Sequence, residues 1–251
     1  MKIFASASLV ALVATSVHAG SFTDNFDGAP PIGFTRTTGA ETGGTTTFVA
    51  SDAAHGTSLQ IQMPDVDAGY GRVTLNSPTN EPIGKLRDVS ATFETFIDAS
   101  SDVVLPPYVL LGLDNNNDGQ YDSNTESLVI QFSSQNATPT AGAWVTETFD
   151  GSNNVHVVVD RGGLAAGDYS PDSTPDKLSD LYSEIYSGTT LWGDLNVFRV
   201  RIAAGFFNAG AGDQDYTALV DNLSVTAVPE PTTLAVLGLG VLGLLRRRVV
   251  R

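Results

Sequence analysis

The sequence predicts an all-β protein whose central part is a single antiparallel β-sandwich. Between residues 21 and 225, apolar and polar residues alternate in short runs, for example in Leu59-Gln60-Ile61-Gln62-Met63. Such alternation is typical of strands that bury one face. Clusters of Gly, Asn, Asp and Pro separate the runs, which indicates closely spaced turns. The chain has 251 residues, enough for one sandwich with a substantial core.

The predicted strands follow one another along the body. The clearest are 59–63, 73–75, 88–98, 108–113, 128–132, 143–149, 155–159, 195–204 and 217–225. Segments 108–113 and 128–132 are nearly continuous apolar runs, as expected of central strands. No long internal repeat or linker divides residues 20–227, so we expect one domain.

One helix is expected inside the acidic segment 167–188. Thr174 and Pro175 offer an N-cap and a proline at the first helical position. Apolar residues then recur at spacings of three and four, and Gly188 is a suitable C-terminal residue. The apolar positions are Leu178, Leu181, Tyr182 and Ile185.

The N-terminal segment, residues 1–19, has the three parts of a secretory signal peptide. Lys2 precedes the apolar run 8–14, and Val17-His18-Ala19 ends in small residues suited to cleavage. We therefore predict export, cleavage by signal peptidase and a mature chain that begins at Gly20.

The C-terminal segment, residues 228–251, reads as a membrane-directed sorting signal. Pro229-Glu230-Pro231 precedes an uncharged stretch from Leu234 to Leu245, and Arg246, Arg247 and Arg248 follow. The stretch is shorter than the ~20 residues of a stable membrane span, and the arginines favour the cytoplasmic side. These features predict transient insertion into the inner membrane.

This three-part tail resembles the PEP-CTERM sorting signals of Gram-negative bacteria. The resemblance implies processing by an exosortase, a membrane-anchored precursor, and delivery to the cell surface or the extracellular matrix.

The body is strongly acidic once both ends are removed. Residues 20–227 keep 8 of the 13 basic and 27 of the 28 acidic residues, a net charge of −19. This argues against nucleic-acid binding, and it would repel acidic polysaccharides unless a cation bridged the two. The absence of cysteine excludes disulfides, thiolate zinc sites and cysteine nucleophiles.

The 114–122 loop has the spacing of a calcium site, D-x-N-x-D-G-x-x-D. Its predicted ligands are the side chains of Asp114, Asn116, Asp118 and Asp122 and the carbonyl of Gln120. It resembles the calcium loops of EF-hands, dockerins and thrombospondin type 3 repeats, although Thr125 stands where an EF-hand has Glu.

We expect a structural calcium with an affinity on the order of 10⁻⁴–10⁻³ M. The alternative is a hairpin turn without metal, which Asn-Asp-Gly forms readily.

No catalytic residue is assigned. His156 lies on the strand face opposite Val155, and a lyase base there would need a Tyr or Arg nearby. No carboxylate pair stands out as a glycosidase acid and nucleophile. Among the aromatics, Trp144 is expected in the core, whereas Trp192 is placed in a loop as a candidate ligand platform.

Two short motifs at the ends of the body resemble jelly-roll domains of secreted bacterial proteins, including carbohydrate-binding modules and concanavalin-like sandwiches. They are Phe22-Thr23-Asp24-Asn25-Phe26-Asp27-Gly28 and Val220-Asp221-Asn222-Leu223-Ser224-Val225. We therefore predict a non-enzymatic surface or matrix protein that binds extracellular polysaccharide. The alternatives are a polysaccharide lyase or glycoside hydrolase on the same kind of sandwich, and a self-associating structural matrix component.

Overall fold

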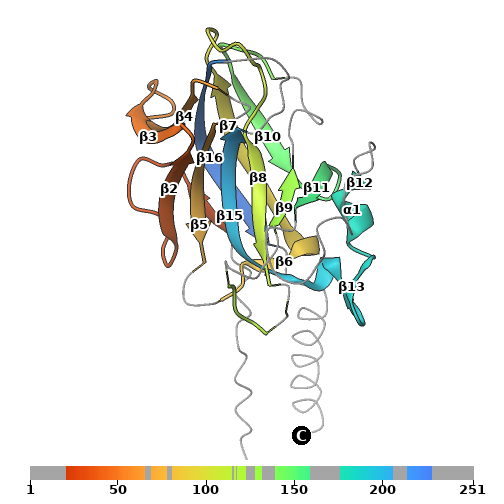
Figure 1. Cartoon of the computed structure of the whole chain (residues 1–251). Coiled ribbons are helices and arrows are strands. Elements are labelled where there is room, and N and C mark those ends of the chain that lie inside the picture. Colours follow the sequence, from red (N-terminus) through yellow and green to blue (C-terminus); the bar gives the residue numbers. More distant parts are fainter. Residues whose placement is uncertain are drawn as a thin grey trace, which may run out of the picture.

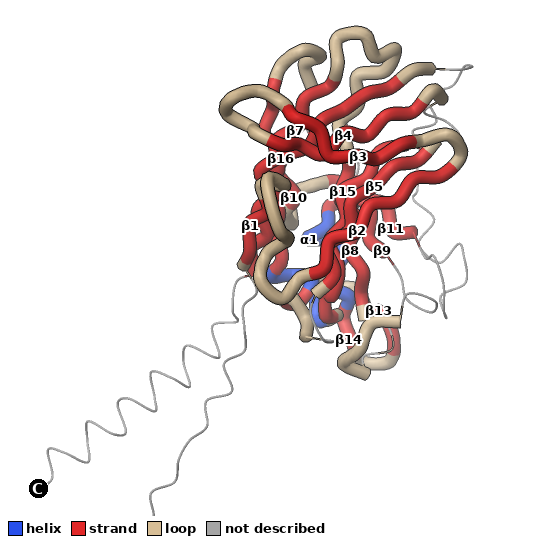
Figure 2. The backbone as a smooth tube through the Cα atoms, turned by 90° about the vertical axis from the view of Figure 1, so that its left-hand side faces the viewer, coloured by secondary structure: helices blue, strands red, loops and turns tan. Residues whose placement is uncertain are grey.

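The protein is a sandwich of two antiparallel β-sheets (Figure 1). The computed structural model describes residues 21–65, 69–77, 81–114, 116, 118–122, 128–131, 139–158, 176–205 and 214–227. The predicted signal peptide and sorting segment lie outside these ranges. Within them, no helix is long and apolar enough to cross a membrane. Figure 2 shows the layers from the side.

The first sheet has six strands in the order β10-β7-β16-β4-β3, with β1 beside β16. Their bounds are β1 Phe22–Asp24, β3 Thr45–Ala50, β4 Thr57–Met63, β7 Val89–Ile97, β10 Trp144–Phe149 and β16 Tyr216–Ala227. The two ends of the body are paired, because Phe22 of β1 is in register with Val225 of β16.

The second sheet has eight strands in the order β12-β11-β9-β8-β15-β5-β2, with β6 beside β15. Their bounds are β2 Thr35–Glu41, β5 Tyr70–Asn76, β6 Gly84–Lys85, β8 Tyr108–Leu113, β9 Leu128–Gln131, β11 Asn154–Val158, β12 Asp176–Lys177 and β15 Asn196–Gly205. A separate hairpin consists of β13 (Ile185–Ser187) and β14 (Thr190–Leu191).

Every strand predicted from alternation is present, with small shifts at its ends. The prediction missed β2 and β3, which are edge strands of the two sheets. Both are rich in threonine and largely exposed, so neither shows the apolar alternation that identifies a half-buried strand.

The predicted helix is much shorter than expected. The α-helix α1 covers only Leu178–Leu181, and both of these leucines are buried. Asp176 and Lys177 form β12 instead of a helical first turn, and Ile185 belongs to β13 with 62% of its surface exposed. The apolar residues that are spaced like one helix therefore belong to two separate elements, α1 and β13. Two 3₁₀ turns, η1 (Leu86–Asp88) and η3 (Trp192–Asp194), complete the described helical structure.

The core lies between the two sheets. Burial alternates along the whole of β7, whereas every residue of β8 is buried, as expected of a central strand covered on both faces. Burying one such large apolar side chain contributes about 1.5–3 kcal/mol. All described strands and all described core residues lie between Phe22 and Ala227. This segment therefore contains the contacts that fold it.

The side chain of Glu147 places a carboxyl group on the inward face of β10. It is 3% exposed, alternates with the fully buried Phe149, and its Oε1 has no hydrogen-bond partner among the described residues. Burial raises the pKa of Glu147 to about 7. Because ionisation of a buried carboxyl group is unfavourable, the folded state keeps its proton at a pH where the unfolded chain loses it.

We predict that the protein loses stability between about pH 4.5 and pH 7, because the folded state holds more protons than the unfolded chain in this window. Glu147→Gln, which stays neutral, should raise the free energy of unfolding at pH 8 by about 2 kcal/mol. Urea unfolding at pH 5 and pH 8 measures the difference. An equal effect of the substitution at both pH values would contradict the assignment.

Candidate functional site

Three arginines project from the outer face of the eight-stranded sheet. Arg72 lies on β5, and Arg199 and Arg201 lie on the adjacent strand β15. Val200 and Ile202 of β15 are fully buried in the core, so the arginines that alternate with them point away from it. In Figure 1, β5 and β15 run side by side across the front of the molecule.

Tyrosine rings hold these arginines in place. The Cζ atom of Arg199 lies 4.6 Å from the centre of the Tyr121 ring, and that of Arg72 lies 5.2 Å from the centre of the Tyr70 ring. Nη1 of Arg201 is 3.5 Å from the hydroxyl of Tyr70. Guanidinium groups are attracted to aromatic ring faces. We call Tyr70, Arg72, Tyr121, Arg199 and Arg201 the arginine–tyrosine face.

Gly112 of β8 explains why Tyr121 fits on this face. A Cβ atom at position 112 would come within 2.9 Å of both the Tyr121 ring and the Cβ of Arg199. Since contacts that short do not occur in folded proteins, a larger residue would push the ring and the arginine outward. Glycine therefore allows the ring of Tyr121 to approach the sheet closely.

The positive charges of this face are only partly neutralised. Nε of Arg199 donates to Oδ1 of Asn76 at 2.7 Å, and Nε of Arg201 donates to Oγ1 of Thr74 at 3.2 Å. Both acceptors are uncharged. Arg72 forms an ion pair with Glu41, with 2.8 Å between Nη1 and Oε1.

The three arginines are close enough to influence one another's ionisation. Burial lowers the pKa of Arg199, and the charges of Arg201 and Arg72 lower it further, while Tyr121 acts in the opposite direction. Three like charges on adjacent strands repel one another. The fold therefore keeps cations together at some expense of stability.

The 114–122 loop is tied to the same face through Tyr121. Its first residue, Asp114, is fully buried, and its Oδ1 and Oδ2 accept hydrogen bonds from the backbone N–H groups of Asp118 and Gly119 at 3.2 and 2.9 Å. Gly119 has φ of 81°, which glycine tolerates best. Asn116, Asp118, Gln120 and Asp122 lie at the surface.

The described part of the loop is a tight turn closed by its own side chains. Oδ1 of Asn116 accepts from the N–H of Asp118, and Oδ1 of Asp118 accepts from the N–H of Gln120. Among the described residues, no three His, Asp or Glu side chains are grouped to hold a metal ion. Calcium binding by this loop stays a prediction.

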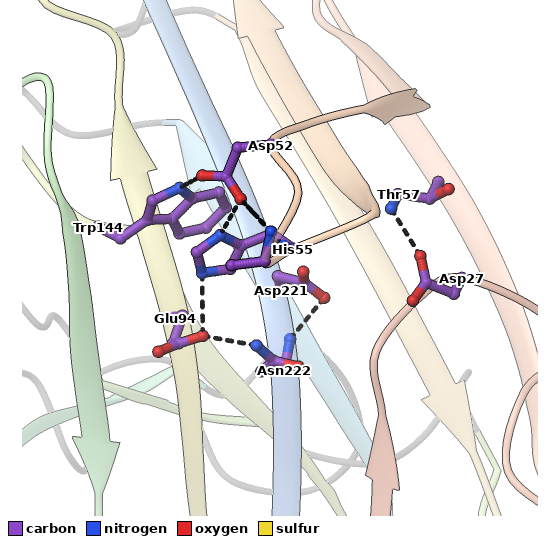
Figure 3. A network of polar contacts seen from close by, with 9 residues as sticks. Asp27, Asp52, His55, Thr57, Glu94, Trp144, Asp221 and Asn222 are labelled. Carbon is purple, nitrogen blue, oxygen red and sulfur yellow. Dashed lines mark hydrogen bonds and ion pairs between the residues drawn. The ribbon is translucent and has the colours of Figure 1, made fainter.

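A second polar cluster lies on the outer face of the six-stranded sheet (Figure 3). The rings of His55 and Trp144 stack with centroids 3.8 Å apart. Nδ1 of His55 is 2.7 Å from Oδ1 of Asp52, and its Nε2 is 3.2 Å from Oε2 of Glu94. Nδ2 of Asn222 donates to the same Glu94 oxygen at 2.6 Å.

This cluster fastens the turn between β3 and β4 to strands β7 and β10. The indole Nε1 of Trp144 donates to Oδ2 of Asp52 at 2.9 Å. The hydrogen bond from His55 is the main reason why the pKa of Asp52 falls to about 2. Only 11% of the His55 side chain is exposed. Both ring nitrogens of His55 are engaged with carboxylates, so we assign the cluster a structural role.

The burial of the two tryptophans is the reverse of what the sequence predicted. Trp192 is fully buried in η3 and packs edge-on against Tyr186 at 4.8 Å, so it is not available as a ligand platform. The flanking glycines indicated a loop, but the 3₁₀ turn directs the indole inward. Trp144 is half-buried on the outer face of β10, because Glu147 and Phe149 occupy the inward positions of that strand.

His156 belongs to β11, at the far side of the eight-stranded sheet. The register runs from His156 to Ile130 of β9, then to Leu110 of β8 and Arg201 of β15. The backbone of His156 therefore lies in the same cross-strand row as Arg201, three strands or about 14 Å away. Its side chain lies outside the described residues.

Comparison with known families identifies the C-terminal segment. The PEP-CTERM protein-sorting motif matches residues 227–249. The chain carries a PEP-CTERM sorting signal. This motif implies processing by an exosortase, as the sequence predicted, and the matched segment begins at the last residue of β16. None of the curated proteins compared matches the chain.

Several solved structures are similar to the body of this protein. The family 11 carbohydrate-binding module of Clostridium thermocellum, solved with a β-1,3-1,4-linked tetrasaccharide, has 13% identity and a TM-score of 0.45 over 84% of this chain and 96% of the module. The CBM22-1 xylan-binding domain from Paenibacillus barcinonensis has 15% identity and a TM-score of 0.37 over 82% and 93%. An endo-β-1,4-glucuronan lyase from Trichoderma reesei has 13% identity and a TM-score of 0.41 over 82% and 95%.

The reversed tryptophan positions can be checked by fluorescence, because the chain has two tryptophans. The variant Trp192→Phe retains only Trp144, and the variant Trp144→Phe retains only Trp192. We predict that acrylamide quenches the fluorescence of Trp192→Phe several-fold more strongly than that of Trp144→Phe. The physical reason is that the quencher reaches a half-buried ring and not a fully buried one. Equal quenching in the two variants would contradict this placement.

Proposed function

We propose that this protein is exported, processed at its PEP-CTERM signal, and held at the cell surface or in the matrix, where its sandwich binds extracellular polysaccharide. The observation that carries the proposal is the arginine–tyrosine face. It presents three guanidinium groups, supported by aromatic rings, on adjacent strands of one sheet.

The geometry of a sheet suits an extended polymer. Alternate residues of a strand are about 6.8 Å apart, and neighbouring strands are about 4.8 Å apart. Arg199, Arg201 and Arg72 therefore form a diagonal row of donors. Each guanidinium is planar and offers several N–H groups in a fixed fork, which can bridge two oxygens of a sugar unit. Rigid strands rather than loops hold these donors, so their spacing is preorganised.

Calcium in the 114–122 loop would support this face. The motif provides oxygen ligands at the expected positions, and the buried Asp114 already directs its carboxylate into the turn. The same loop carries Tyr121, whose ring lies beside Arg199. We propose that a bound calcium orders the loop and thereby keeps Tyr121 in position.

A polysaccharide lyase is the second candidate function. The observation that favours it is the cross-strand row that contains both His156 and Arg201. A lyase needs a base that removes a proton and a cation that stabilises the resulting negative charge. The separation of about 14 Å between these two strands makes binding without cleavage the better-supported function.

We predict that residues 20–227 bind at least one polysaccharide in a panel of neutral and acidic extracellular polymers. Binding is measured by affinity gel electrophoresis and calorimetry. Tyr121→Ala should weaken it about tenfold, because the ring that supports Arg199 is lost. Thr146→Ala, an exposed residue of β10 on the other sheet, is the matched control and should have no effect.

Two outcomes would contradict the proposed binding function. A folded protein that retains no polymer of the panel would refute it. Depolymerisation by the wild type and not by His156→Ala would assign the lyase activity instead, and the release of unsaturated sugar ends detects it.

Calcium at 5 mM should raise the free energy of unfolding by about 1–2 kcal/mol over a chelator-treated sample, given the weak affinity expected for this loop. Asp118→Asn should abolish the increment, whereas Asp180→Asn, an exposed residue of α1, should leave it intact. Urea unfolding with calcium and with chelator gives both values. A calcium increment of the same size in Asp118→Asn would rule out this loop as the site.

A further inference from the structure

We infer that the arginine–tyrosine face recognises a polysaccharide that carries carboxylate groups, a polymer of uronic acids. This inference rests on the proposed function and narrows its ligand class. It also revises the expectation that the acidic body as a whole would repel acidic polysaccharides.

The first argument is the distribution of positive charge. The body has 8 basic residues, and Arg72, Arg199 and Arg201 place three of them on one face of one sheet. Arg36 and Arg87, elsewhere in the fold, each form an ion pair with an aspartate, Asp24 and Asp194. Cations are thus concentrated at one place on a body whose net charge is −19.

The second argument is what these arginines contact. Arg199 and Arg201 bond to the neutral side chains of Asn76 and Thr74, and among the described residues neither has a carboxylate within ion-pair distance. The body contains 27 acidic residues, so acidic partners were available in the sequence. A half-buried guanidinium without a counter-charge is unfavourable, and an external anion would relieve this.

The third argument is the direction of the free donors. The bonds to Asn76 and Thr74 use the Nε–H group of each guanidinium. They orient each side chain on the sheet and do not use the terminal Nη1 and Nη2 groups. One N–H of Arg201 Nη1 is directed at the hydroxyl of Tyr70 at 3.5 Å, and the remaining terminal N–H groups form the fork that binds a carboxylate with two parallel hydrogen bonds. Neutral sugar hydroxyls could accept from the same groups, but these bonds lack the added strength of a charged acceptor.

The fourth argument is the arrangement of the charges in a row. Arg199 and Arg201 are two residues apart on β15, and Arg72 continues the row diagonally on β5, opposite Ala203. Arginines gathered around one small anion would converge on a point. A row spaced by the strand geometry suits negative charges that repeat along a chain.

The net negative charge of the body does not prevent such binding. At physiological ionic strength the screening length is about 8 Å. A polymer lying on the face therefore interacts mainly with charges in its immediate surroundings, and the distant carboxylates of the body contribute little. The nearby charges are those of Arg72, Arg199 and Arg201, the carboxylate of Glu41 that pairs with Arg72, and the acidic 114–122 loop that carries Tyr121.

The test compares polygalacturonate with the same polymer after its carboxylates have been reduced to alcohols, using calorimetry on residues 20–227 without added calcium. The wild type should bind polygalacturonate at least about tenfold more tightly than the reduced polymer. The double variant R199Q/R201Q should lose at least about tenfold in affinity for polygalacturonate and stay within about threefold for the reduced polymer.

The matched control is K85Q/R87Q, which removes the same number of positive charges near Asp194. It should bind polygalacturonate like the wild type. R199K/R201K keeps the charges but loses the planar forks, so it should fall between the wild type and R199Q/R201Q. Thermal unfolding of each variant verifies that it is folded.

The outcomes separate the two proposals. Equal binding of both polymers by the wild type would overturn the carboxylate inference and leave polysaccharide binding in place. Unchanged binding of polygalacturonate by R199Q/R201Q would overturn the assignment to this face. Binding of dextran sulfate without binding of polygalacturonate would replace carboxylate by sulfate as the recognised group. A folded wild type that binds none of these polymers, nor any of the wider panel, would refute the proposed function as well.

Discussion

The structure depends on the pairing of β16 within the six-stranded sheet. This strand of twelve residues bonds to β7 on one side and to β4 and β1 on the other, and its inward side chains are buried between the two sheets. Because β16 is the last strand before the sorting motif, the sheet is complete only when nearly the whole body is present. Its pairing with β1 also brings the first and last strands of the domain together.

The arginine–tyrosine face depends on this frame in turn. Core residues on the inward side of β15 fix which of its residues face outward, and the registers with β5 and β8 determine what lies beside them. The result is a group of like charges that repel one another, while many carboxylates lie elsewhere in the body. Binding sites often retain such unfavourable arrangements because a ligand relieves them.

The sequence predicted most of the fold because strands with one buried face show a period of two. β7 and β16 were evident on this basis, whereas the exposed edge strands β2 and β3 were not. The candidate site was missed for a related reason. Arg72 lies far along the chain from Arg199, so the sequence does not show that they share a face. The residues next to Arg199 in the sequence also do not indicate that Tyr121 lies beside it. One local signal was available. Arg199 and Arg201 alternate with apolar residues in the sequence, and this pattern predicts that both arginines lie on the outer face of the strand.

By itself the sequence determined the sorting motif, the acidic charge, the strand order along the chain and the class of fold, because each of these depends on residues close together in the chain. Only the tertiary structure decided which tryptophan is buried and which arginines share a face, because both depend on strand register and on turns that join distant segments. Trp192 shows the difference most clearly. Its neighbours in the sequence suggest an exposed loop, but packing of the 3₁₀ turn against the core buries its ring completely.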